Sequence, residues 1–230
     1  MWVLLFSCKK DNTPTSTSPN IDSLPIPFKN RNWWKYQRID SVFAPPYAGS
    51  TNGWHSRDSS IELITVIGKA QYVDVAIIMP PVESIVLEVK NLTQGTLDTI
   101  HTFYINPNYD NAYFMIRSKD TFNLPIKIPL VEGTKRIIKP GTGFDFDDFT
   151  FYKNASVTVL NKTFDSCNYT EDYQYYYGLH RQNGYRVKTY FKANIGFVYW
   201  EVNDDWGFDN VYINYTKFKY RRLIDYHIEP

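Results

Sequence analysis

Apolar and polar residues alternate along this chain in short runs, a pattern typical of β-strands that bury one face. The clearest runs are IELITVI at 61–67 and YVDVAIIM at 72–79, both rich in β-branched residues. No window holds a helical period over three turns. The predicted strands are 61–67, 72–79, 84–89, 99–105, 112–117, 149–152, 156–160, 163–168, 173–179, 185–191, 195–202, 211–219 and 220–228.

Turn residues separate these runs and set the expected hairpins. Asn183-Gly184 is the strongest such signal, because both residues readily adopt the left-handed backbone of a tight hairpin turn. Residues 124–130 contain two prolines and suit an edge strand or a loop better than a central strand. Further turns are expected at 68–69, 106–108 and 203–205.

About a dozen strands at regular spacing predict an all-β fold. We expect a single antiparallel, twisted sheet that closes into a sandwich or half-barrel, with little helix. Residues 28–39 are ambiguous, and a short helix is one interpretation of them. Trp34 and Tyr36 stand two residues apart, as they would on one face of a strand, which suits a core anchor.

The N-terminal segment indicates a lipid anchor. The short apolar run at 2–6 ends in Ser7-Cys8, and residues 5–8 (LFSC) resemble a lipobox, with an apolar residue at −3 and a small one at −1. A cysteine in that setting carries acyl chains that hold a protein at a membrane. We expect residues 1–8 to be the remnant of a lipoprotein signal peptide and Cys8 to be the lipidation site, although no basic segment precedes Trp2.

A flexible tether and one domain are expected to follow. Residues 9–27 are rich in Ser, Thr, Asn and Pro and bury too little to fold, whereas 28–230 form one β-rich domain. This organisation predicts a protein of the cell envelope, anchored at the outer membrane on its periplasmic face or at the surface. The other cysteine, Cys167, lies in an alternating apolar run and is expected to be buried.

Composition adds an excess of aromatic residues and little net charge. Aromatic residues make up 17% of the chain and the formal net charge is +1, so nothing points to a nucleic-acid partner. Core packing accounts for most of the rings, but those near turns are candidates for binding a glycan, a lipid or an envelope protein. These candidate ligand-binding residues are Trp54, Tyr175, Tyr177 and Trp206.

Motifs for catalysis and for cofactors are missing from the sequence. It contains no G-x-S-x-G, no H-E-x-x-H and no P-loop, and we expect no enzyme activity and no cofactor. Two acidic clusters leave a calcium site open, although neither has the spacing of an EF-hand loop. The clusters are Asp145, Asp147 and Asp148, and Asp204, Asp205 and Asp209.

Three short segments together resemble a family of predicted outer-membrane or surface lipoproteins of Bacteroidetes-type bacteria. They are N-W-W-K-Y at 32–36, T-F-D-S-C at 163–167 and A-N-I-G-F-V at 193–198 with Glu201 after it. The family usually has glycine where this chain has Arg31 and Lys162. Since the family has no assigned activity, the resemblance implies a lipoprotein and adds no catalytic residues.

The leading hypothesis is therefore a membrane-anchored envelope lipoprotein with a non-catalytic domain that binds a ligand or partner. One alternative is a half-barrel that carries lipid or lipoprotein in an apolar cavity of several hundred Å³. The other is an enzyme acting on polysaccharide through Asp145, Asp147 or Asp148, since paired carboxylates serve glycosidases.

Overall fold

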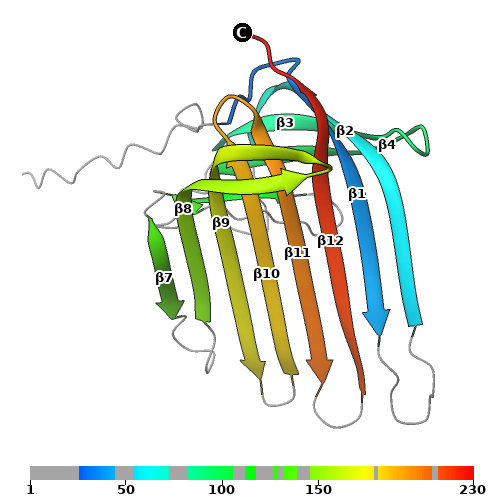
Figure 1. Cartoon of the computed structure of the whole chain (residues 1–230), viewed down its shortest axis with the longest axis vertical. Helices are drawn as coiled ribbons and strands as arrows, with labels where there is room; N and C mark the ends of the chain where they lie inside the picture. The colour runs from blue at the N-terminus through cyan, green and yellow to red at the C-terminus, as the bar shows by residue number, and fades with distance from the viewer. Residues whose placement is uncertain are drawn as a thin grey trace, which may run out of the picture.

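The computed structural model describes residues 26–44, 54–72, 82–105, 112–117, 127–128, 132–138, 146–178, 181–208 and 212–230 (Figure 1). These residues form strands and short turns and contain no helix, which confirms the predicted all-β class. Accordingly, they include no helix long and apolar enough to span a membrane. Cys8 and residues 9–25 of the tether predicted at 9–27 lie outside the described residues, so the anchor stays a prediction.

Twelve strands are present in the described residues. They are β1 Trp33–Ala44, β2 Trp54–Tyr72, β3 Val82–Asn91, β4 Thr96–Ile105, β5 Ala112–Arg117, β6 Lys127–Ile128, β7 Gly133–Ile138, β8 Phe146–Val159, β9 Lys162–Gly178, β10 Arg181–Lys192, β11 Gly196–Phe208 and β12 Tyr212–His227.

The strands form one antiparallel sheet in the order β6-β5-β4-β3-β2-β1-β12-β11-β10-β9-β8-β7. Every pair of strands that are consecutive in sequence is hydrogen-bonded except β6 and β7, and β1 also pairs with β12, the last strand. The two edge strands, β6 and β7, are consecutive in the chain and only residues 129–132 separate them. Five backbone steps span at most about 18 Å, so the sheet must curl until its edges approach each other. The fold is the expected curved sheet, with the proline-flanked β6 at an edge.

Several predicted turns lie inside strands instead. β2 continues through residues 68–69, where the pairing with β3 shifts at a bulge between Val66 and Gly68. Asn183-Gly184 lies within β10, and 203–205 lie within β11. The segments in β10 and β11 pair with a strand on each side, and that tertiary pairing overrides the local turn preference. The ambiguous segment at 28–39 contains no helix, since β1 begins at Trp33.

The first and last segments of the family resemblance meet in the core on the inner face of the sheet, which is the face that carries Trp34 and Tyr36. Trp34 Nε1 donates to the carbonyl of Ile195 at 2.5 Å, and Tyr36 OH donates to the carbonyl of Phe197 at 2.7 Å. Both side chains are buried, which confirms them as core anchors. Cys167 is also fully buried, as expected.

Asn32 joins the start of the domain to its end. Its side chain is fully buried, its Nδ2 donates to the carbonyl of Pro27 at 2.6 Å, and its Oδ1 accepts from the backbone N–H of Glu229 at 2.8 Å. Ile26, just before this junction, is buried in the core. The first and last described segments are therefore fixed to each other beside the β1–β12 pair.

A charged cluster interrupts the apolar inner face. Glu62 is buried and accepts from Arg38 Nη1 at 2.8 Å and from Arg221, while Arg38 also pairs with Asp40 at 2.6 Å. The Arg221 guanidinium lies 5.3 Å from the Trp200 ring. Burial alone would raise the pKa of Glu62, but the two arginines lower it below its ordinary value.

Candidate functional site

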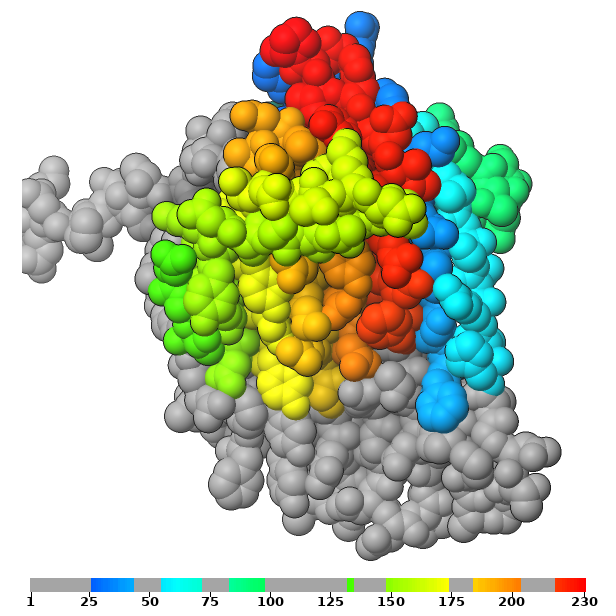
Figure 2. Space-filling view, viewed as in Figure 1, coloured from blue at the N-terminus to red at the C-terminus, as the bar shows by residue number. Residues whose placement is uncertain are grey.

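The hairpin formed by β8 and β9 folds back across the outer face of the sheet, opposite the core. Its pairing shifts at two bulges, between Tyr152 and Ala155 and between Ala155 and Val157. Positive φ angles at Asn154 (57°) and Ser166 (55°) mark the bend on both strands. Figures 1 and 2 show the bent part, residues 154–166, as a band across β10, β11 and β12. We call this band the arm.

Apolar contacts hold the arm against the sheet. Val159 and Phe164 are almost fully buried beneath it. Lys162 Nζ lies 5.0 Å from the Phe164 ring and 5.7 Å from the ring of Tyr226 on β12. The tip is a two-residue turn, Leu160-Asn161, in which both φ angles are positive, as a type I′ turn requires.

A row of tyrosines crosses the outer face below the arm. In register, Tyr152 of β8 pairs with Tyr169 of β9, then Tyr190 of β10 and Tyr199 of β11. The ring centroids of Tyr169 and Tyr190 are 4.8 Å apart, and those of Tyr190 and Tyr199 are 6.1 Å apart. The next residue in the row is Arg222 of β12.

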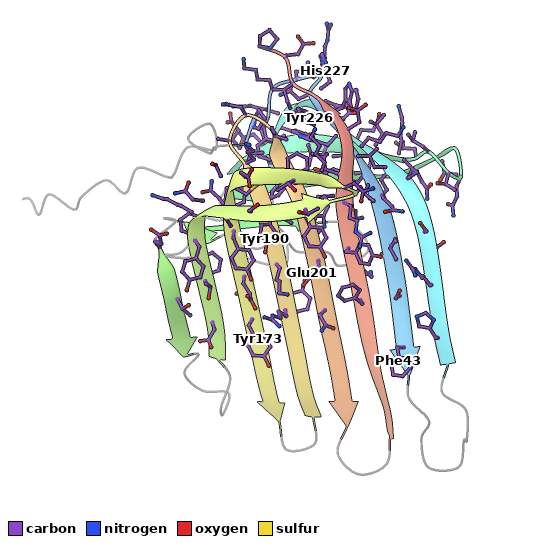
Figure 3. The ribbon with its side chains drawn as sticks, viewed as in Figure 1. Phe43, Tyr173, Tyr190, Glu201, Tyr226 and His227 are labelled. Carbon is purple, nitrogen blue, oxygen red and sulfur yellow. The ribbon has the colours of Figure 1, made fainter. Side chains whose placement is uncertain are left out.

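A second row, one step further along the strands, carries charges of alternating sign. Glu171, Lys188 and Glu201 are directly paired across β9, β10 and β11. Lys188 Nζ contacts Glu201 Oε1 at 2.7 Å. Glu201 Oε2 accepts from Tyr199 OH at 2.6 Å, so both of its oxygens are engaged. Figure 3 places Tyr190 and Glu201 on the same face of the sheet.

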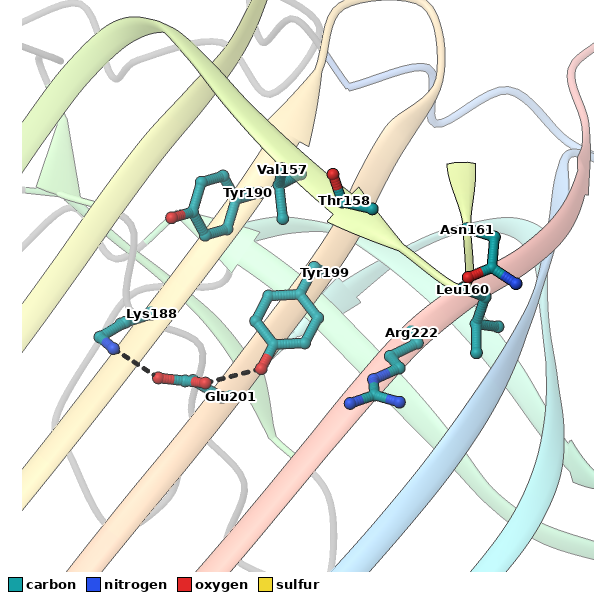
Figure 4. A pocket seen from close by; sticks show the side chains of 9 residues that line it. All are labelled: Val157, Thr158, Leu160, Asn161, Lys188, Tyr190, Tyr199, Glu201 and Arg222. Carbon is teal, nitrogen blue, oxygen red and sulfur yellow. Dashed lines mark hydrogen bonds and ion pairs between the residues drawn. The ribbon is translucent and has the colours of Figure 1, made fainter. Parts of the chain in front are cut away.

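The arm and these two rows enclose a pocket of about 600 Å³, a size typical of small-molecule sites. Figure 4 shows the sheet residues facing the residues of the arm across it. The lining residues are Val157, Thr158, Leu160 and Asn161 from the arm, and Lys188, Tyr190, Tyr199, Glu201 and Arg222 from the sheet.

The tyrosines of the pocket are protonated at neutral pH. Burial and the hydrogen bond to Glu201 raise the pKa of Tyr199. Burial, together with the negative charges of Glu201 and Glu171, raises the pKa of Tyr190. Both hydroxyls are therefore hydrogen-bond donors at neutral pH and would be poor bases.

Arg222 differs from the other charged residues of the pocket. Its guanidinium lies over the Tyr220 ring at 4.5 Å but forms no hydrogen bond or ion pair within the described part of the chain. Two cations, Lys188 and Arg222, against one anion, Glu201, leave the lining with a net charge of +1. Since Glu201 is engaged by Lys188 and Tyr199, the cation left for a ligand is Arg222.

None of the sequence-predicted binding residues is among the described residues that line this pocket. Trp54 starts β2, Tyr175 and Tyr177 lie near the end of β9, and Trp206 lies near the end of β11, and their side chains are outside the described residues. Trp206 of β11 pairs with Asn183 of β10, and Asn183 pairs with Tyr176 of β9. Trp206 is therefore aligned with Tyr176 rather than with Tyr175 or Tyr177. Their binding role stays a prediction.

The calcium hypothesis also stays a prediction, because most of the residues that it names lie where no side chain is described. Of the six aspartates, only Asp148 has a described side chain, and it is half-buried. The residues that are described contain no cluster of three or more carboxylate, histidine or cysteine side chains able to hold a metal ion.

Sequence reasoning missed the pocket residues, although one signal was present. A Tyr-x-Glu triplet occurs at 169–171 and again at 199–201, and in a strand both residues of a triplet share a face. In each, the tyrosine hydroxyl donates to the glutamate two residues later. The repeat indicated a polar face but gave no hint of the arm that covers it.

Comparisons with known proteins identify no family for this chain. Neither the protein-family models nor the curated protein sequences gave a match. One similar solved structure is a protein of Parabacteroides distasonis inferred to be a lipoprotein, at 13% identity and a TM-score of 0.37, covering 88% of this chain and 98% of that one. Another is a protein of Bacteroides fragilis inferred to be exported, with a YmcC-like fold, at 11% identity, a TM-score of 0.38 and the same coverage. At these TM-scores the likeness is too loose to carry a conclusion about fold or function.

Proposed function

We propose that this protein is a lipid-anchored protein of the bacterial cell envelope that binds a ligand, without catalysis, in the pocket under the arm. The pocket itself is the observation that carries the proposal. It lies between two parts of the fold that are well packed, since Val159 and Phe164 fix the arm while β10, β11 and β12 form its floor. A site built on packed elements holds its shape before a ligand arrives.

The chemistry of the pocket favours binding over catalysis. Its carboxylate, Glu201, is engaged by Lys188 on one oxygen and by Tyr199 on the other. The raised pKa of both tyrosines makes them donors and not bases. A nucleophile with an adjacent free base, which covalent catalysis requires, is not found among the residues that line it.

The proposed location in the cell envelope rests on the N-terminal sequence. The LFSC segment at 5–8 and the polar stretch from residue 9 to residue 25 together make an acylation site and a spacer. A spacer of this composition behaves as an extended flexible chain, so the domain could reach a ligand away from the membrane surface.

The inner face is less suited to the alternative of a lipid carrier. The buried cluster of Arg38, Glu62 and Arg221 puts charged groups among the apolar residues of the inner face. Ions that are buried and paired in this way offer an acyl chain no apolar wall. The described pocket lies on the opposite, outer face.

A variant that fills the pocket tests the proposal. Val157 lines the pocket, and the preceding residue, Ser156, is exposed and is not one of the lining residues. We would screen the full chain by saturation-transfer NMR against neutral oligosaccharides, acidic oligosaccharides and short-chain phospholipids. We expect at least one probe to bind the wild type and Ser156→Trp but not Val157→Trp.

Two outcomes would overturn the proposal. If no probe bound, the pocket would have no ligand among the molecules abundant in an envelope. If a probe bound Val157→Trp as well as the wild type, the site would lie elsewhere on the chain. Circular dichroism of both tryptophan variants distinguishes loss of binding from loss of fold.

A further inference from the structure

Arg222 is placed as an anion-binding group would be. Its guanidinium lines the pocket and is held by the Tyr220 ring at 4.5 Å, which leaves its N–H groups available. A guanidinium presents a planar fork of donors that matches a carboxylate with two parallel hydrogen bonds. With a net lining charge of +1, one carboxylate would neutralise the pocket.

Beside Arg222 the floor of the pocket is aromatic and rich in donors. Tyr199 is the cross-strand neighbour of Arg222, and Tyr190 follows in the same row. The Tyr190 hydroxyl makes no hydrogen bond to any described residue, and its raised pKa keeps the proton in place. Rings that combine an apolar face with a free donor suit a ligand that has both C–H surfaces and oxygens, as a sugar ring does.

The arm supplies a polar side opposite this floor. Asn161, at its tip, faces the pocket with an amide that can both donate and accept, and Thr158 adds a hydroxyl. The aliphatic part of the lining is limited to Val157 and Leu160, and Leu160 is 45% exposed. Such a lining would bind an acyl chain poorly.

We propose that the ligand of this pocket is an acidic saccharide, with its carboxylate on Arg222 and its sugar ring against Tyr190 and Tyr199. This inference rests on the proposed function, because it names the ligand class of that same pocket. Lys188 and Glu201 then form a paired, neutral border beside the bound carboxylate.

Isothermal titration calorimetry on the full chain tests the ligand class. The probes are a galacturonic acid trimer and the neutral galactose trimer with the same linkages. We expect the acidic trimer to bind at least about tenfold more tightly, the effect of one hydrogen bond to a charged group. Arg222→Gln should remove this preference, and Arg222→Lys should lose most of it, because an ammonium cannot form the two parallel bonds.

The matched control is Arg31→Gln, which removes the same charge from an exposed position outside the pocket. It should keep the preference. If both trimers bound equally and Arg222→Gln changed neither, while Val157→Trp abolished both, the acidic ligand would be wrong and the pocket would stand. If neither trimer bound any form of the protein, this inference would fail, and the wider screen would decide the proposed function separately.

A lipid headgroup is the other source of an anion in an envelope. Vesicles of phosphatidylglycerol and inorganic phosphate are therefore titrated in parallel. Binding of either one through Arg222, without binding of the galacturonic acid trimer, would overturn the saccharide assignment. Binding of the trimer alone would support it.

Discussion

Trp34 and Gly196 approach so closely that a side chain on Gly196 would collide with the indole. A β-carbon there would lie 2.9 Å from Trp34 Nε1, and Gly196 also has a φ angle of +96°. The indole N–H meanwhile donates to the carbonyl of Ile195, 161 residues away in sequence. The tryptophan of the first motif therefore packs directly on the glycine of the last. This contact explains the presence of both residues by packing, without a ligand.

Gly196→Ala should destabilise the fold strongly. The left-handed backbone costs about 1 kcal/mol for an L side chain, and the clash with Trp34 adds overpacking, so we expect about 3 kcal/mol in total. Gly133→Ala is the matched control, because Gly133 has a similar φ angle of +112° with no atom within 4 Å of an added β-carbon. Urea denaturation measures both. Equal losses would show that backbone strain alone explains Gly196.

Arg31→Gly should stabilise the protein. Arg31 has a φ angle of +72° and is exposed, at the position where the resembling family has glycine. Glycine removes the cost of the left-handed backbone in the folded state, and this outweighs the larger conformational entropy that glycine gives the unfolded chain. We expect the free energy of unfolding to rise by about 0.5–1 kcal/mol. Asn30→Gly is the control, since Asn30 is exposed but has no positive φ angle, and it should lose stability. A loss at both positions would contradict the prediction.

The alternation of apolar and polar residues was enough to predict the class and most strands, but not where strands end. Asn183-Gly184 is a turn signal by local preference, yet its neighbours on β9 and β11 bond it into the sheet. Strand ends depend on long-range pairing of this kind, which no local pattern contains. The anchoring role of Trp34 and Tyr36 was predictable because their spacing alone puts them on one face.

The pocket was beyond prediction for a different reason. Its floor combines residues from β10, β11 and β12, and their alignment depends on registers interrupted by bulges. Its roof exists because the hairpin bends at Asn154 and Ser166, and neither residue is the glycine that usually marks such a bend. A bend at non-glycine residues is visible only in the folded backbone.

Glu62 should make stability depend on pH in the acid range. Its pKa is lowered in the folded protein, so the stabilisation is present above the ordinary value near 4.5 and is lost as pH falls through the folded value. Glu62→Gln leaves Arg38 and Arg221 without their buried partner and should cost about 3 kcal/mol at pH 7. Urea denaturation between pH 3 and pH 7 measures both the loss and the slope.

The control for this prediction is Glu83→Gln. Glu83 pairs with Lys69 in an exposed setting, so its removal should change stability by less than about 0.5 kcal/mol. If Glu62→Gln kept the full acid slope of the wild type, other carboxylates would be responsible for it.

Tyrosine burial should destabilise the fold at high pH. Burial raises the pKa of Tyr36 well above its ordinary value of 10.0, so the stabilisation is complete below pH 10 and is lost as pH rises further. Tyr36→Phe loses the hydrogen bond to Phe197 and about 1 kcal/mol at pH 7, but should flatten the alkaline slope. Phenolate absorbance at 295 nm, recorded alongside unfolding, tests this. An unchanged slope in Tyr36→Phe would assign the effect to the other tyrosines with raised pKa values, Tyr169, Tyr190 and Tyr199.

Cys8→Ala should release the protein from membranes. We would express the full chain behind a basic secretion leader in a bacterial host and separate membranes from soluble protein at high salt. The wild type should sediment with membranes and carry an added acyl mass at its N-terminus, because two or more acyl chains hold a protein stably where one does not. Cys167→Ala is the matched control, since Cys167 is fully buried and out of reach of an acylating enzyme, and it should sediment like the wild type. A Cys8→Ala protein that still sedimented would mean that the domain itself binds the membrane, and the anchor would then have to be sought on the β-sheet surface.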